Sequence, residues 1–277
     1  MQLKIGILVV GSLDWESKCY PDCHQLNFGK WKGVAKHRQD WRTDRLTNNE
    51  CHVQVPIRYG RCSESRAWTY TMVFSPEYGH RQGKAKIIEC KRRVTEFGEL
   101  KTEATELWWA EGSGRGNRTG AISASWGRVV LIKPHSFLSS IAQDPKELRD
   151  RQELLTRWAG LPASTIEFSA GDRAAVASGA PINDGCLQIA WPSQVNERPA
   201  DFDLLLATAT LPQVNINGII TTGVYPDITM VANAWRNSSG DAYYFWFNRL
   251  RGICTDDDDE IARRIAKPPG WPLQEWP

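Results

Sequence analysis

Leu3–Leu13 reads LKIGILVVGSL, and the expected architecture of the chain is built around this stretch. Its apolar run is rich in β-branched side chains and too short to span a membrane, so it predicts a buried central strand over Leu3–Val10. Gly11-Ser12 then ends the strand in a turn of small residues, which can present backbone N–H groups to an anion or a polarised carbonyl. An ordinary core strand with an ordinary turn is the alternative.

The composition is that of an ordinary globular protein. The 277 residues, of which 41% are hydrophobic and 24% charged, suffice for one large domain or two small ones. A net charge of only +2 argues against the broad basic footprint of a nucleic-acid-binding protein. No apolar run reaches the roughly 18 residues of a membrane span, and no targeting segment is visible, so we expect a cytoplasmic protein. Its seven cysteines should then be reduced.

Two stretches suggest ligands that we weigh and set aside. Cys19, Cys23-His24 and Cys51-His52 have the right residue types for zinc, but their spacing matches no standard zinc motif, so we expect no metal. Residues 30–45 interleave basic residues with two tryptophans, as in surfaces that bind single-stranded nucleic acid. Because acidic residues dilute this charge, we favour a solvated segment whose tryptophans anchor it to the core.

Further strands and helices are indicated along the chain. Strands are expected at Val53–Arg58, Trp68–Phe74, Ala85–Cys90, Arg128–Ile132, Cys186–Trp191 and Phe202–Ala207. Residues 59–66 are expected to be a polar connection. Helices are expected at Glu99–Glu111, Asp144–Trp158 and Asp241–Leu250, with a last one capped by Thr255. The aspartates after Thr255 suit the positive end of that helix better than a metal site.

The helix Glu99–Glu111 places one carboxylate in an unusual position. At about 100° per residue, Glu111 falls within the apolar arc formed by Leu100, Ala104 and Leu107, whereas Glu106 falls on the opposite face and should be solvated. A glutamate on an apolar face is costly unless it is partnered or faces a pocket. The alternative is a frayed last turn in which Glu111 reaches water. The glycine-rich residues 112–120 that follow suggest a flap or a flexible connection.

Three short motifs together resemble the gamma-glutamylcyclotransferase-like family, in particular its longer bacterial members. They are Gly11-Ser12-Leu13, the stretch from Val55-Pro56-Ile57 through Arg61–Arg66 to Thr69–Thr71, and the helix end Leu107–Gly112. The family has Tyr-Gly-Ser-Leu at the first motif, and here Val10 stands in place of the tyrosine. The resemblance covers about the first 120 residues. A weaker echo follows at Tyr243–Phe247, Gly252-Ile253 and Thr255-Asp256.

This resemblance implies an α+β fold in two parts. Residues 1–135 would form a small mixed or antiparallel β-barrel with flanking helices, and residues 136–277 a C-terminal α/β extension packed on the same core.

The resemblance also implies a transferase that converts a gamma-glutamyl amine to 5-oxoproline and a free amine, without a cofactor. Glu111 matches the family's acid/base, and the amides of Gly11, Ser12 and Leu13 match its substrate cradle. The substrate-binding side chains would be Arg61, Ser63 and Arg66, although the arginines are equally explained by a structural ion pair. A catalytically inactive barrel that binds a ligand or a protein is the alternative. We expect a small-molecule partner, neither nucleic acid nor membrane, and the oligomeric state stays open.

Overall fold

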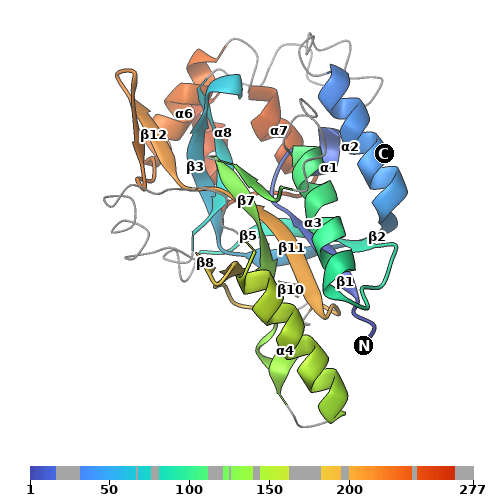
Figure 1. Cartoon of the computed structure of the whole chain (residues 1–277). Helices are drawn as coiled ribbons and strands as arrows, with labels where there is room; N and C mark the ends of the chain where they lie inside the picture. The colour runs from blue at the N-terminus through green and yellow to red at the C-terminus, as the bar shows by residue number, and fades with distance from the viewer. Residues whose placement is uncertain are drawn as a thin grey trace.

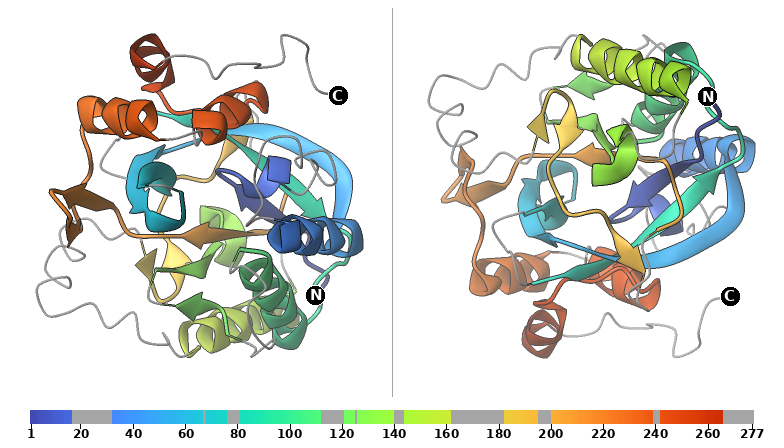
Figure 2. Two further views of the ribbon diagram at one scale, coloured as in Figure 1. Left: turned by 90° about the horizontal axis from the view of Figure 1, so that it is seen from above. Right: turned by 90° about the horizontal axis from the view of Figure 1, so that it is seen from below.

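The computed structural model describes residues 1–16, 32–66, 68–75, 81–111, 121–124, 126–139, 144–161, 182–194, 200–238 and 242–265. Over these residues the chain forms two mixed β-sheets and several helices, so the fold class is mixed α+β (Figure 1). Figure 2 shows the strands lying between one group of helices formed by α6, α7 and α8 and another formed by α3 and α4.

The larger sheet is built around the N-terminal strand, β1 (Ile5–Val9), as predicted. β1 is completely buried and lies between two long partners, antiparallel to one and parallel to the other. In the described chain the order is β10 (Ser193–Gln194), β2 (Leu46–Val55), β5 (Gly83–Cys90), β1, β11 (Leu204–Ala209), β7 (Gly127–Ile132), β9 (Cys186–Leu187) and β8 (Ile182–Asn183), with β6 (Ser123–Ala124) paired to β7.

The smaller sheet begins where proline interrupts the chain. Its order is β13 (Ile219–Thr222), β12 (Gln213–Ile216), β3 (Ile57–Ser63) and β4 (Thr69–Phe74). Only Pro56 separates β2 from β3, and because proline has no N–H to donate, the ladder of the larger sheet stops there. The Pro56 carbonyl instead accepts a hydrogen bond from the Ser75 N–H at 2.8 Å. The single strand expected over residues 53–58 is therefore two strands in two sheets.

The prediction of a polar connection over residues 59–66 was wrong. Most of these residues belong to β3, and only Glu64–Arg66 leave it, as the short 3₁₀ helix η2. The pairing of β3 with β4 shifts register between Tyr59 and Arg61, which disturbs the alternation by which a strand is recognised.

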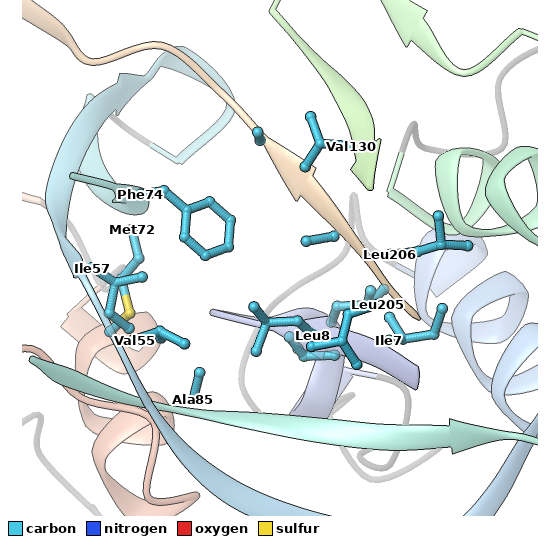
Figure 3. Close-up of a cluster of buried hydrophobic side chains, with 14 of the residues drawn as sticks. Ile7, Leu8, Val55, Ile57, Met72, Phe74, Ala85, Val130, Leu205 and Leu206 are labelled. Atoms are coloured by element: carbon cyan, nitrogen blue, oxygen red, sulfur yellow. The ribbon is translucent and has the colours of Figure 1, made fainter. Parts of the chain in front are cut away.

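Both sheets contribute to one apolar core, but the expected barrel is not closed. Figure 3 shows Leu8 and Leu205 of the larger sheet in one cluster with Ile57, Met72 and Phe74 of the smaller one. Among the described strands, no pairing joins the two sheets into one ring. The break at Pro56 explains this, because the chain starts a second sheet there instead of extending the first.

The described helices are α1 (Leu13–Glu16), α2 (Lys32–Arg45), α3 (Phe97–Glu111), α4 (Pro145–Ala159), α6 (Ile228–Asn237), α7 (Ala242–Leu250) and α8 (Asp258–Arg264), with a 3₁₀ turn η4 (His135–Leu138). Among them, α3, α4, α7 and α8 were predicted, whereas α1, α2 and α6 were not. Asp144 accepts a hydrogen bond from the Lys146 N–H at the start of α4, as expected of a cap. Thr255 does not cap α8 but donates its backbone N–H to Asp258. No described helix is long and apolar enough to cross a membrane.

The C-terminal half enters the centre of the larger sheet. β11 lies between β1 and β7, so a strand from beyond residue 200 joins two strands from the first 135 residues. α7 packs on α1, where the Phe247 and Trp15 rings stack with centroids 5.0 Å apart. The described part of the chain after residue 136 thus contributes to the same core as the earlier strands, and it supplies one of the central strands of the larger sheet.

Candidate functional site

The candidate site begins at the carboxyl end of β1. β1 and β11 are parallel, so their carboxyl ends lie at the same edge of the sheet, the edge at which open α/β sheets bind ligands. Gly11 and Ser12 form the turn there, and α1 starts at Leu13. The Glu16 N–H donates to the Ser12 carbonyl at 2.9 Å, which ties the turn to the helix.

Two buried arginines converge on this turn. Arg66 Nη2 donates to Ser12 Oγ at 2.9 Å and to Glu16 Oε1 at 2.7 Å. Arg38 Nη1 lies 3.4 Å from Ser12 Oγ and forms an ion pair with the other Glu16 oxygen. Glu16 therefore bridges the two guanidinium groups. The turn is consequently held by charged partners from η2 and α2, far apart in the sequence.

Arg38 also connects the turn to Glu111 at the end of α3. Its Nε donates to the Ala110 carbonyl at 3.0 Å, and its Nη2 lies 3.5 Å from Glu111 Oε2. Burial lowers the pKa of Arg38 to about 10, and the charge of Glu111 opposes this shift. The Glu111 side chain is 22% exposed, so its carboxylate is partnered yet still reaches solvent. The predicted apolar arc explains its location, because Leu100, Ala104 and Leu107 are fully buried.

Arg61 approaches the same group from β3. Its guanidinium lies over the Trp126 ring, 5.3 Å from the centroid, and that ring stacks on Trp108 of α3. Arg61 Nε is buried without a hydrogen-bond partner, and within the described residues no carboxylate forms an ion pair with this side chain. Burial lowers the pKa of Arg61, Arg66 lowers it further, and Glu111 raises it. Arg61 is thus a cation that lies near Glu111 but is not neutralised by it.

Tyr244 of α7 completes the group. A Cβ added at Gly11 would lie 2.6 Å from Tyr244 Oη, so the hydroxyl occupies the space above the turn. The Arg66 guanidinium lies over the Tyr244 ring at 4.5 Å from the centroid. Burial raises the pKa of Tyr244; Arg66 and hydrogen bonds with the Asn248 side chain and the Met72 backbone lower it, and Glu111 raises it.

The predicted site residues therefore separate into two sets. The structure brings Gly11, Ser12, Arg61, Arg66 and Glu111 to one place. Leu13 and Ser63 form the second set. Leu13 is buried as the first residue of α1, and the Ser63 carbonyl accepts a hydrogen bond from the Trp68 N–H at 2.9 Å.

Three members of the group were missed by sequence reasoning: Glu16, Arg38 and Tyr244. Arg38 lies within the basic segment 30–45, whose alternation of charge and tryptophan was the only available signal. In the structure Arg38 and Trp41 are buried, so this part of α2 faces the protein interior.

The prediction that Glu106 is solvated was wrong. Its residue is only 8% exposed, and its carboxylate lies 3.5 Å from Arg45 of α2. Glu103 pairs with the same arginine at 3.2 Å. The cause is the packing of α2 against α3, which covers the face that an isolated amphipathic helix would expose.

A second buried ionic cluster lies on the other side of α1. Lys86 Nζ is 3.3 Å from Asp14 and 2.9 Å from Glu50, and Arg251 Nε donates to Asp14 at 2.9 Å. These groups pair with one another, which is the arrangement that buried charges require. We therefore interpret this cluster as structural.

No group of three or more potential metal ligands occurs among the described residues. Cys19, Cys23 and His24 of the zinc alternative, and the expected flap at residues 112–120, lie outside that part of the chain.

Around the Gly11-Ser12 turn, Arg38 and Arg66 thus pair with Glu16 and Glu111. Arg61, which lies on Trp126 and interacts electrostatically with Glu111, adds one excess positive charge to this group. Such a group can bind an anionic substrate and move a proton next to it. Comparison with protein-family models, with curated proteins and with solved structures found no match to the chain.

Proposed function

We propose that the protein is an intramolecular acyl transferase of the gamma-glutamylcyclotransferase type, which converts a gamma-glutamyl amine to 5-oxoproline and a free amine. One observation carries the proposal: Arg38 reaches Ser12 Oγ at 3.4 Å and Glu111 Oε2 at 3.5 Å. The Arg38 guanidinium thus contacts both Glu111, a carboxylate suited to proton transfer, and the Gly11-Ser12 turn, which is suited to bind a carbonyl group. This supports a single reaction centre.

The reaction needs one proton shuttle and one oxyanion cradle. The lone pair of the substrate's α-amine forms a bond to the γ-carbonyl carbon, and the carbonyl electron pair moves onto oxygen. Glu111 takes the proton from the attacking nitrogen. When the carbonyl re-forms, the bond to the leaving nitrogen breaks and Glu111 returns the proton there. Because the attack closes a five-membered ring within one molecule, positioning provides much of the rate, and neither water nor an oxidant is consumed.

The two candidate arginines have different roles in this proposal. Arg66 already donates to Ser12 and Glu16, so we assign it to holding the turn. Arg61 has no carboxylate partner in the described chain and lies against Trp126, so we assign it to the α-carboxylate of the substrate. The backbone N–H groups of the turn would stabilise the oxyanion.

The test is release of 5-oxoproline and amine from a panel of gamma-glutamyl amines. Glu111→Gln keeps the shape of the side chain but cannot carry a proton, so turnover should fall by about 10²–10⁴-fold while the fold persists. Glu153→Gln is the matched control, because Glu153 is an exposed residue of α4 and should leave the rate unchanged. Glu106 is unsuitable because its ion pair with Arg45 is buried.

Two outcomes would contradict this proposal. If Glu111→Gln retains the wild-type rate, the proton shuttle is another group. If the wild type binds 5-oxoproline in calorimetry but converts no member of the panel, the protein is a binding module that shares the arrangement without the turnover.

A further inference from the structure

The hydroxyl of Tyr244 lies directly over Gly11 of the turn. A Cβ at Gly11 would meet Tyr244 Oη at 2.6 Å and the ring carbon Cζ at 3.7 Å. The closest part of Tyr244 to the turn is therefore its hydroxyl and not its ring. Gly11 leaves room for that oxygen because it has no side chain of its own.

The ring is fixed in orientation by its surroundings. Tyr244 stacks on Trp235 of α6, with centroids 5.7 Å apart and planes 8° apart. Trp15 of α1 meets it edge to face at 6.1 Å, and the Arg66 guanidinium lies over it. A residue held on several sides by rigid groups directs its polar atom with little loss of entropy when a ligand arrives.

The hydroxyl also interacts electrostatically with four charged groups of the site, Arg38, Arg61, Arg66 and Glu111. The pKa values of Arg38 and Arg61 are both raised by Tyr244, and the pKa of Tyr244 responds to Arg66 and Glu111. Because burial raises the pKa of Tyr244, the side chain stays a neutral O–H donor at neutral pH. A neutral donor that is already oriented in a cationic, water-poor place is suited to stabilise a developing oxyanion.

We infer that Tyr244 is a catalytic residue whose hydroxyl donates a hydrogen bond to the γ-carbonyl oxygen of the substrate as that oxygen becomes an oxyanion over the Gly11-Ser12 turn. This inference rests on the proposed function. The proton remains on Tyr244 throughout, and Glu111 alone transfers protons. The donor comes from α7, so the C-terminal half of the chain takes part directly in the reaction.

Tyr244→Phe tests this role because it removes one oxygen and keeps the ring. Loss of one oxyanion donor should lower kcat by about 10²–10³-fold with KM changed less than about threefold. Tyr243→Phe is the matched control, since Tyr243 is the adjacent, half-buried residue of the same helix and should keep the wild-type kcat. Circular dichroism and thermal unfolding of both variants report whether the fold is retained.

A second substitution separates donation from packing. Replacing Tyr244 with fluorinated tyrosines keeps the ring and the hydroxyl but makes the O–H more acidic, so kcat should stay within about tenfold of wild type and change systematically with that acidity. The inference is wrong if kcat does not change with the acidity of the hydroxyl, or if the kcat of Tyr244→Phe is within about threefold of wild type. Neither result would contradict the proposed function. A wild type that converts no gamma-glutamyl amine overturns both.

Discussion

Replacing Gly11 with alanine should create a clash that a second substitution removes. The added Cβ would lie 2.6 Å from Tyr244 Oη, closer than real Cβ atoms approach other atoms. The backbone itself should accept alanine, because Gly11 is absent from the residues with positive φ. Overpacking of this kind costs about 1–3 kcal/mol of unfolding free energy. In the Tyr244→Phe background the nearest atom is Cζ at 3.7 Å, an ordinary contact, so most of that cost should disappear.

The assay is a double-mutant cycle measured by urea and thermal unfolding of the wild type, the two single variants and the double variant. We expect a coupling free energy of roughly 1–3 kcal/mol between the two substitutions. Each kcal/mol of unfolding free energy should correspond to a change in Tm of about 2–4 °C. Gly98→Ala is the control, because Gly98 is exposed in the first turn of α3 and alanine there should be neutral or stabilising in both backgrounds. Additive costs within about 0.5 kcal/mol would refute the contact between Gly11 and the hydroxyl.

Three further predictions concern charged groups. Arg61→Lys should raise KM for a gamma-glutamyl amine about tenfold with an unchanged Tm, because lysine lacks the planar guanidinium that binds a carboxylate through two hydrogen bonds. Equal kinetics in the wild type and in Arg61→Lys would remove Arg61 from the site. Arg66→Lys should lower Tm, because it weakens the hydrogen bonds to Ser12 and Glu16. Burial raises the pKa of Asp258 to about 7 from 3.8, so the folded state holds this proton more tightly than the unfolded state. The stabilisation that this proton gives is present below about pH 4 and is lost as pH rises to about 7, by up to about 1.4 kcal/mol of unfolding free energy per pH unit. Asp258→Asn should reduce this dependence of unfolding free energy on pH, measured by denaturation curves at several pH values. An unchanged dependence would contradict the raised pKa of Asp258.

Local signals were sufficient for the elements that depend on nearby residues. The apolar run of β1 and the Asp144-Pro145 start of α4 predict their structures because the determining residues are adjacent in sequence. The helix α3 and the location of Glu111 on its apolar arc also follow from periodicity alone. The proximity of Glu111 to the Gly11-Ser12 turn was expected only from the resemblance of short motifs to a known family, because no pattern in the sequence itself relates these two positions.

Long-range packing explains what the sequence could not predict. The burial of Glu106 depends on α2 covering α3, and no pattern within α3 reports a neighbour about 60 residues away. Arg38 looks like one more charge in a polar helix until its partners Glu16 and Glu111 are known. The prediction of a closed barrel was wrong for a similar reason, because a proline can either cause a bulge in a strand or direct the chain into another sheet.

The position of β11 has a consequence for how the protein is made. During synthesis from the N-terminus, β1 and β7 leave the ribosome well before their shared neighbour, which is completed only at Ala209. Until then both strands have unpaired edges rich in aliphatic side chains, the kind of surface that associates with other nascent chains or recruits chaperones. Because this pairing spans about 200 residues, closing it should be among the slow steps of folding. The nascent chain therefore cannot complete its central sheet until about three quarters of it has been translated.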